Sequence, residues 1–234
     1  DTAWMKYVEA CTIESKATTE PADIKIEVAR GGEYKIRLED GTTVWLNSES
    51  SLIYPEKFTG DKRAVRLSGE GYFEVARDEK KPFIVSVTDM EIKVLGTKFN
   101  VTAYQDEKMT TTTLISGAVE VVTPHRSVQL QPGKQAMVQE GGDDITVLEV
   151  DVELATSWTA GIFKFDKMAL TDICTRLSRW YDIDFVFEGE TGKEKFTGGT
   201  WKYVPLKDFL SKIERVTNVL FLFENNTVKV VPKK

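Results

Sequence analysis

Hydrophobic and polar residues alternate along most of the chain that precedes residue 150. From residue 24 onward, apolar positions recur every second residue in short runs, and Gly, Pro, Asn or Asp separate the runs. Residues 34–38 (YKIRL) and 43–46 (TVWL) flank the hairpin dipeptide Asp40-Gly41. A period of two is typical of strands with one buried face. Residues 24–154 are therefore predicted to form an all-β domain, either a sandwich or an irregular β-solenoid.

The pattern changes after Asp151. Residues 170–181 carry apolar side chains three and four positions apart, which predicts an amphipathic helix, and Pro205 opens a second segment of this kind. Short apolar runs predict strands at 161–165, 182–188, 219–223 and 227–231. The order β-α-β, then β-α-β-β, predicts a small α+β domain at residues 155–234, with its helices on one face of a short sheet. Residues 1–23 show neither period and are expected to be a leader or linker.

The composition supports a folded protein with a substantial core. Of the 234 residues, 41% are hydrophobic and 29% are charged, which suits two modest domains and excludes a disordered chain. Lys and Arg number 31 against 37 Asp and Glu, a net charge of −6, so we expect no nucleic-acid partner. No run approaches the roughly 18 uncharged apolar residues of a spanning helix, so these residues are not expected to cross a membrane.

Residues able to carry catalysis or bind a metal are sparse. His125 is the one histidine, and it lies in a TPHRS segment that predicts an exposed turn. Cys11 and Cys174 stand 163 residues apart, which excludes a CxxC motif, and Cys174 falls on the apolar face of the first helix, where core packing is expected. Glu70 and Glu74 lie about 13 Å apart on a predicted strand, wide for a glycosidase pair. We expect no enzymatic activity, no cofactor and no metal.

Several blocks of the β domain resemble the FecR family. They are residues 30–34 (RGGEY), 38–47 (LEDGTTVWLN), 66–76 (RLSGEGYFEVA), 94–101 (VLGTKFNV) and 130–133 (LQPG). Glu39 stands where the family usually has Pro, and Gly71 where it usually has Ala. Further on, residues 161–165 (GIFKF) and 177–183 (LSRWYDI) resemble the small domain that follows FecR domains, which is itself similar to the short N-terminal domain of secretins and TonB-dependent receptors.

The resemblance implies the periplasmic part of an anti-sigma regulator anchored in the inner membrane by one helix. Members of the family bind an extracytoplasmic-function sigma factor through a short cytoplasmic segment and sense an outer-membrane TonB-dependent transporter in the periplasm. On that basis, the expected partner of these residues is the periplasmic signalling domain of such a transporter. The sigma factor would be contacted only through the cytoplasmic segment, which lies outside this chain.

Two kinds of binding surface are consistent with the residues. The first is a docking surface on the α+β domain, where the last strand has no later segment to cover it and is expected to accept a partner strand. Its residues are Thr227, Val228, Lys229, Val230 and Val231, with Trp201 and Tyr203 as an adjoining apolar anchor. The alternative is a carbohydrate- or small-ligand-binding β domain, since five Trp, seven Tyr and twelve Phe supply rings for stacking. An open groove lined by aromatic residues and paired carboxylates would favour this alternative.

Overall fold

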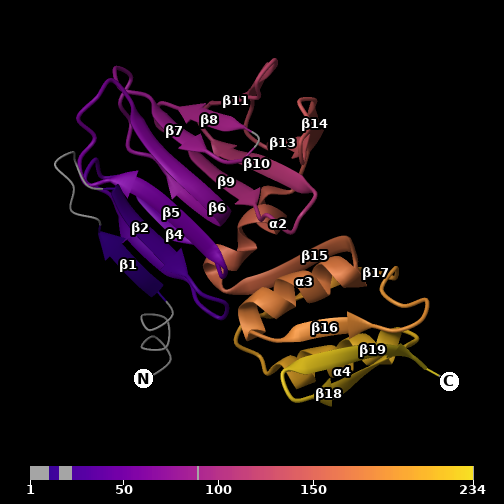
Figure 1. The fold of residues 1–234 in the computed structure, drawn as a ribbon. Helices are drawn as coiled ribbons and strands as arrows, with labels where there is room; N and C mark the ends of the chain where they lie inside the picture. Colours follow the sequence, from indigo (N-terminus) through magenta and orange to yellow (C-terminus); the bar gives the residue numbers. More distant parts are fainter. Residues whose placement is uncertain (1–10, 16–22, 89, 234) are drawn as a thin grey trace. The chain divides into compact units, whose positions relative to one another are not determined.

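The computed structural model describes residues 11–15, 23–88 and 90–233. The chain divides into two compact units, residues 1–156 and 157–234, and each is considered by itself (Figure 1). No helix in the described ranges is both long enough and apolar enough to cross a bilayer.

In its described residues, the first unit consists of strands followed by one short helix, α2 (Val152–Thr156), which contacts β10. The strands are β1 (Cys11–Ser15), β2 (Asp23–Val28), β3 (Tyr34–Arg37), β4 (Thr43–Leu46), β5 (Ser50–Pro55), β6 (Arg63–Glu74), β7 (Phe83–Ser86), β8 (Glu91–Val94), β9 (Lys98–Ala103), β10 (Met109–Ser116), β11 (Val119–Val122), β12 (Ser127–Leu130), β13 (Lys134–Gln139) and β14 (Ile145–Glu149). Their pairing forms one large sheet, whose main path runs β12-β11-β8-β7-β6-β9-β10-β13-β14.

The 12-residue strand β6 joins two halves of this sheet. Its first residues pair with β5 and, in parallel, with β7, whereas its last residues pair with β4 and β9. Gly69 lies at the change of partners with φ at +89°, and a Cβ there would meet Ser50 Oγ at 2.4 Å. Only glycine allows the strand to pass this point without displacing Ser50.

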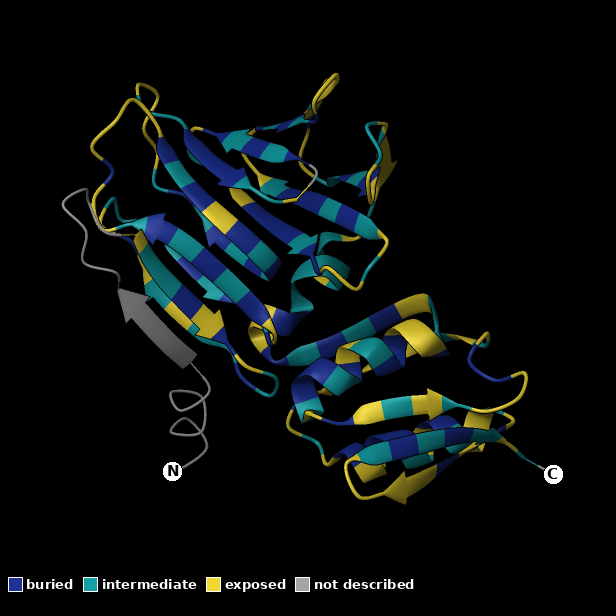
Figure 2. Cartoon of the chain, in the orientation of Figure 1, coloured by how far each residue is buried: buried dark blue, intermediate teal, exposed yellow. Residues whose placement is uncertain are grey.

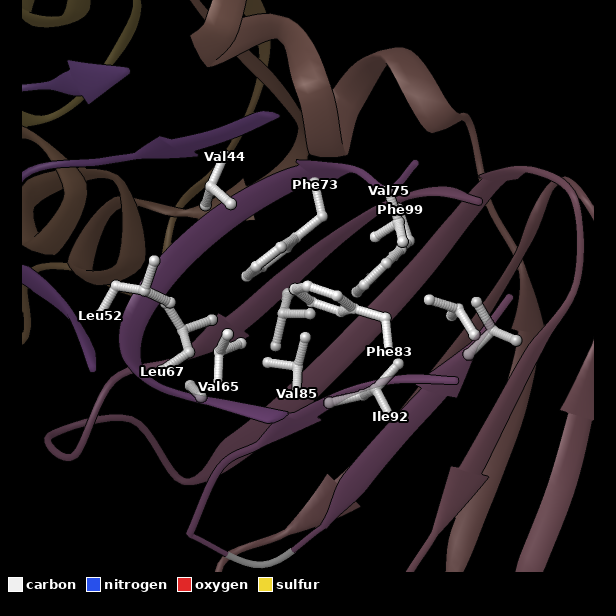
Figure 3. Packing of buried hydrophobic residues seen from close by; sticks show 14 of the residues in the cluster. Val44, Leu52, Val65, Leu67, Phe73, Val75, Phe83, Val85, Ile92 and Phe99 are labelled. Carbon is white, nitrogen blue, oxygen red and sulfur yellow. The ribbon is translucent and has the colours of Figure 1, made fainter. Parts of the chain in front are cut away.

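Both halves of the sheet bury one face in a single core. Val65 and Leu67 from the first half of β6 and Phe73 from its second half point into the same cluster as Phe83 and Phe99 (Figure 3). Phe73 stacks on Phe99 with ring centroids 5.0 Å apart and lies 6.4 Å from Phe83. The alternation of buried and exposed residues is visible along the strands in Figure 2. Because the strands of one half pack against those of the other, the unit is closer to a sandwich than to a solenoid.

The second unit contains helices and strands in alternation. Its elements are the 3-10 helix η1 (Ser157–Ala160), β15 (Ile162–Ala169), α3 (Leu170–Tyr181), β16 (Asp184–Phe187), β17 (Lys195–Trp201), α4 (Leu206–Val216), β18 (Val219–Glu224) and β19 (Thr227–Pro232). Helix α3 ends at Asp182, which adopts the left-handed conformation and donates its N–H to Ser178 O. Helix α4 begins directly after Pro205. The apolar stripe of α3 contacts β15 and β16, and α4 contacts β18.

The structure confirms the predicted fold class, a mainly β part followed by a small α+β part with the order βαβ-βαββ. The expectation of one short sheet in the α+β part is wrong. Its strands form two sheets, an antiparallel β15–β17 pair and the three-stranded order β16-β19-β18. The helices pack against both sheets, as the stacking of Phe209 in α4 on Phe165 in β15 illustrates.

The expected leader at residues 1–23 also contains a strand. β1 pairs antiparallel with β2, from Cys11 opposite Val28 to Ser15 opposite Ile24. The sequence pattern missed it because the hydrogen-bond partners come from the neighbouring strand rather than from local periodicity. The remaining residues of the predicted leader, 1–10 and 16–22, lie outside the described ranges.

Candidate partner-binding surface

Two aromatic side chains of the second unit project from the protein surface. Trp201 is the last residue of β17 and is 60% exposed, and Tyr203 follows two positions later and is 61% exposed. Most other aromatic residues of this unit lie in its core. Exposed aromatic residues on an ordered segment are typical of protein interfaces, where Trp and Tyr contribute most binding energy.

The main chain between these two aromatic residues is held by hydrogen bonds on both sides. The Lys202 N–H donates to Gly161 O at 2.9 Å, and the Lys202 carbonyl accepts from Trp180 Nε1 at 2.7 Å and from the Tyr181 hydroxyl at 3.1 Å. The same hydroxyl lies 2.6 Å from Val204 O. Burial raises the pKa of Tyr181 to about 12, so the hydroxyl stays protonated and remains a donor at neutral pH.

The Lys202 side chain points inward and is only 1% exposed. Its Nζ lies 3.9 Å from the centroid of the Trp180 ring, with Phe163 at 5.5 Å and Trp158 at 5.9 Å. A cation placed against aromatic faces is stabilised by their negative quadrupole. Tyr203 in turn meets the edge of Trp180 at a centroid distance of 5.9 Å.

These contacts explain why the two aromatic residues face outward. Lys202 and Tyr203 lie in a turn, which the Val204 N–H closes by donating to Trp201 O at 3.3 Å. The inward Lys202 side chain leaves the two aromatic neighbours on the outside of this turn. Because the segment is already ordered, little conformational entropy remains to be lost when a partner binds. The sequence predicted Trp201 and Tyr203 as surface aromatic residues but missed the buried lysine between them, since lysine is rarely buried.

The structure corrects the expectation for the last strand. β19 contains Thr227, Val228, Lys229, Val230 and Val231, and it is the central strand of its sheet. It pairs in parallel with β16 on one side and antiparallel with β18 on the other. The main-chain N–H and C=O groups on both sides of β19 are therefore paired with neighbouring strands, and β19 offers no edge for a partner strand. The strand was predicted to be open because no later segment was expected to cover it, but β16, some forty residues earlier, pairs with it.

The side chain of Lys233, the residue after β19, binds main-chain carbonyl groups. Its Nζ donates to Glu214 O and, at 2.8 Å, to Thr217 O. These carbonyls lie at the end of α4, where a cation complements the helix dipole. Lys234 lies outside the described ranges.

On the first unit, polar and aromatic residues gather on the outer face of the sheet around Glu70. One oxygen of Glu70 accepts from Asn47 Nδ2 at 2.7 Å, and the other accepts from Asn100 Nδ2 at 2.9 Å and Thr102 Oγ1 at 3.3 Å. The sequence pattern did not reveal this role of Glu70, because its donors come from β9 and from the residue after β4. The carboxylate is occupied by side chains of its own fold.

The aromatic pair near this carboxylate is also engaged within the protein. Trp45 and Tyr72 meet edge to face with centroids 5.3 Å apart, and Lys35 Nζ lies 4.2 Å from the centroid of Trp45. The second carboxylate, Glu74, pairs with Lys98 at 2.7 Å. These contacts stabilise the outer face of the sheet and leave fewer groups available for a carbohydrate.

The described residues contain no cluster of three or more His, Cys, Asp or Glu side chains that could hold a metal ion. His125 lies in an exposed turn, where its main-chain N–H donates to Asp143 Oδ1 at 3.1 Å. Cys174 packs in the core of the second unit, as predicted, and burial raises the pKa of its thiol far above the usual value. A thiol of this kind is a poor nucleophile.

Comparison with known proteins gives the family of the chain. The sequence profile described as FecR protein matches residues 24–120, and the profile described as FecR, C-terminal matches residues 162–230. No curated protein is recognisably similar to the chain. A crystal structure of a protein assigned as an anti-sigma factor in Parabacteroides distasonis ATCC 8503 is 30% identical, with a TM-score of 0.83, over 90% of this chain and 99% of that one.

The chain belongs to the FecR family of anti-sigma factors. A second crystal structure with the same assignment and organism, also 30% identical, gives a TM-score of 0.84 over 91% of this chain and 100% of that chain. The resemblance found in the sequence is thereby confirmed, and it extends over both units.

In this protein, residues of two FecR motif blocks stabilise a turn and connect neighbouring strands. In the 38–47 block, Asp40 caps its own turn by accepting from the Thr42 N–H and hydroxyl, and it pairs with Arg63 at 2.7 Å. Arg63 is 2% exposed and also donates to Ala76 O and Lys81 O. In the 66–76 block, Glu70 joins β6 to its neighbours. These two FecR motif blocks therefore hold strands and turns together.

Proposed function

We propose that this chain is the signal-receiving part of a FecR-type regulator and that its second unit docks the periplasmic signalling domain of an outer-membrane TonB-dependent transporter. In this proposal the regulator controls an extracytoplasmic-function sigma factor through a segment outside this chain, and these residues act in the periplasm of a membrane-anchored protein. Catalysis has no part in the proposed function. Membership of an anti-sigma family supports the regulatory role.

The observation that carries the proposal is the rigid presentation of Trp201. Its side chain is 60% exposed while the next residue is anchored through its main chain and its buried ammonium group. A large apolar side chain held in one position in water is costly unless a partner covers it. The anchored main chain also places Trp201 and Tyr203 close enough to enter one interface.

The test is a calorimetric titration of the purified signalling domain of a TonB-dependent transporter from the same organism. Trp201→Ala should weaken binding at least tenfold, because central aromatic residues carry most interface energy. Phe223→Ala is the matched control, since Phe223 is also an exposed aromatic residue of this unit, at 43%, but lies on β18. Circular dichroism verifies that both variants fold. Equal affinity of wild type and Trp201→Ala would contradict the proposal.

A glycan array with the same protein tests the alternative of a carbohydrate-binding β domain. Binding of a defined glycan that is lost in Trp45→Ala, with no affinity for any transporter domain, would favour that alternative.

A further inference from the structure

The strand β17 is an open edge of the second unit. Among the strands that the structure describes, it pairs only with β15, from Ile162 opposite Trp201 to Ala169 opposite Lys195. Hydrogen bonds flank both ends of this pair, from Lys202 N to Gly161 O and from Leu170 N to Glu194 O. Because the bonds alternate along an antiparallel pair, the main-chain groups of Lys195, Gly199 and Trp201 point away from β15.

The amides on this outer side are available. The N–H groups of Lys195, Gly199 and Trp201 have no hydrogen-bond acceptor among the described residues. All three residues are exposed. The edge contains no proline and carries two adjacent glycines, Gly198 and Gly199, so neither ring nor bulky side chain hinders the approach of another main chain.

A groove begins where β17 begins. It has a volume of about 500 Å³ and lies between Lys195 and Phe196 on one side and the end of α4, with Arg215 and Val216, on the other. Val216 is 74% exposed, which makes part of the groove apolar. Lys195 and Arg215 form no ion pair with any described residue, so their charges are free for a ligand.

The charge of the groove and of the whole unit is positive. Glu194 also lines the groove, but its carboxylate accepts the Gly192 N–H at 3.1 Å. Residues 157–234 contain 13 Lys and Arg against 10 Asp and Glu, a net charge of +3, whereas residues 1–156 carry −9. An acidic segment is therefore the complementary occupant.

We propose that the partner adds an extended strand to the open edge of β17, with an acidic residue at the Lys195–Arg215 end and an apolar residue packed on Trp201. At about 3.3 Å per residue, the distance from Lys195 to Trp201 corresponds to a strand of roughly six or seven residues. Main-chain bonds to Lys195, Gly199 and Trp201 give affinity, and the charged and aromatic ends set the direction of the strand. This inference rests on the proposed function and names the part of the second unit that receives the signalling domain.

Two competing edges of the unit, those of β18 and β16, are less suitable. On β18 the outward amide of Phe221 already donates to Glu214 Oε1 at 2.7 Å. On β16 the outward amides belong to Phe185 and Phe187, since Asp184 and Glu188 donate toward β19 and its preceding turn. The four-residue β16 is also shorter than the seven-residue β17.

The experiment compares Lys195→Ala with Lys195→Pro in titrations with the transporter signalling domain. Both variants remove the cation, but only proline removes the outward N–H, and the first residue of a strand tolerates proline. We expect Lys195→Ala to weaken binding about threefold and Lys195→Pro to weaken it at least thirtyfold. Arg215→Glu should weaken binding further and reduce its dependence on salt concentration. Thermal unfolding verifies that all variants fold.

Hydrogen exchange of the complex supplies the second measurement. Binding should slow exchange at the amides of Lys195, Gly199 and Trp201 and leave those of Phe185 and Phe187 unchanged. Three outcomes would overturn strand addition at this edge while the proposed function stands. The signalling domain could bind the Ala and Pro variants with equal affinity, or it could protect the amides of Phe185 and Phe187 instead. A second copy of this chain could also be found to occupy β17. Absence of any binding by the signalling domain would overturn the proposed function and this inference with it.

Discussion

The carboxylate of Glu214 in α4 accepts a hydrogen bond from the main-chain N–H of Phe221 in β18 at 2.7 Å. Lys233 N donates to Asn218 O at the start of the β18–β19 pair, so the alternation directs the amide of Phe221 away from β19. A side chain of the same unit thus occupies a position that a foreign strand would need. Natural sheets commonly protect their edges with charged groups, and here the protected edge is β18.

Replacing Glu214 by Ala should therefore destabilise the second unit. The variant leaves the amide of Phe221, a buried residue, without its acceptor, and we expect the free energy of unfolding to fall by about 1–2 kcal/mol. Urea denaturation followed by circular dichroism measures the change. Glu224→Ala is the control, because Glu224 is exposed and pairs only with the surface residue Lys229 at 2.8 Å. A similar decrease in the free energy of unfolding in both variants would show that the hydrogen bond from Phe221 to Glu214 does not stabilise the unit more than a surface ion pair does.

The Asp40–Arg63 pair should be among the costliest to break in the first unit. The side chains are 12% and 3% exposed, so Asp40→Ala leaves a buried guanidinium without its counter-ion and should cost about 3–5 kcal/mol. The matched control is Asp23→Ala, which breaks an exposed pair with Arg66 and should change the unfolding midpoint very little. Adding Arg63→Met to Asp40→Ala should recover part of the loss. If the double variant is no more stable than Asp40→Ala, the uncompensated charge of Arg63 does not cause the loss of stability in Asp40→Ala.

Tyr181 should make the protein sensitive to alkaline pH. Burial raises its pKa to about 12 in the folded state, against about 10 in an unfolded chain. Below pH 10 both states keep the proton and the hydrogen bonds of the hydroxyl contribute fully. Between pH 10 and 12 the unfolded state loses its proton first, so stability falls as pH rises. Because the side chain is half-buried, we expect a loss of about 1–2 kcal/mol.

The measurement is the free energy of unfolding of wild type and Tyr181→Phe at pH 8, 10 and 12. The variant lacks the ionisable hydroxyl, so it should be less stable than wild type at pH 8 and should lose less stability toward pH 12. A constant difference between the two proteins across this range would contradict the assigned cause.

The boundary between the two units should be the first site of limited proteolysis. Residues 1–156 and 157–234 form separate compact units, and segments between compact units are cut more readily than strands with paired main chains. We expect a fragment of about residues 158–234, identified by mass spectrometry, that keeps its helical circular dichroism signal. Early cleavage inside the large sheet, with the boundary intact, would mean that the units do not unfold separately.

Local sequence patterns were enough to predict the order and type of most of the elements. The helix expected at 170–181 and the helix after Pro205 are α3 and α4, and the paired runs at 219–223 and 227–231 are β18 and β19. These features follow from local periods of 3.6 and two residues and from turn and cap residues, all of which act over a few positions. The exposure of Trp201 and Tyr203 could also be predicted, because they stand outside the core spacing of both helices and strands.

Only the tertiary structure decided which strands are edges and which polar residues are buried. β19 became central because β16 pairs with it in parallel from some forty residues away, and no local pattern encodes that distance. Lys202 became buried because Trp158, Phe163 and Trp180, from three separate elements, surround its ammonium group. Glu70 became the junction of three strands because its donors arrive from 23 to 32 residues away. Contacts between distant segments fix the burial of a polar side chain, since only they supply the partners that offset its loss of water.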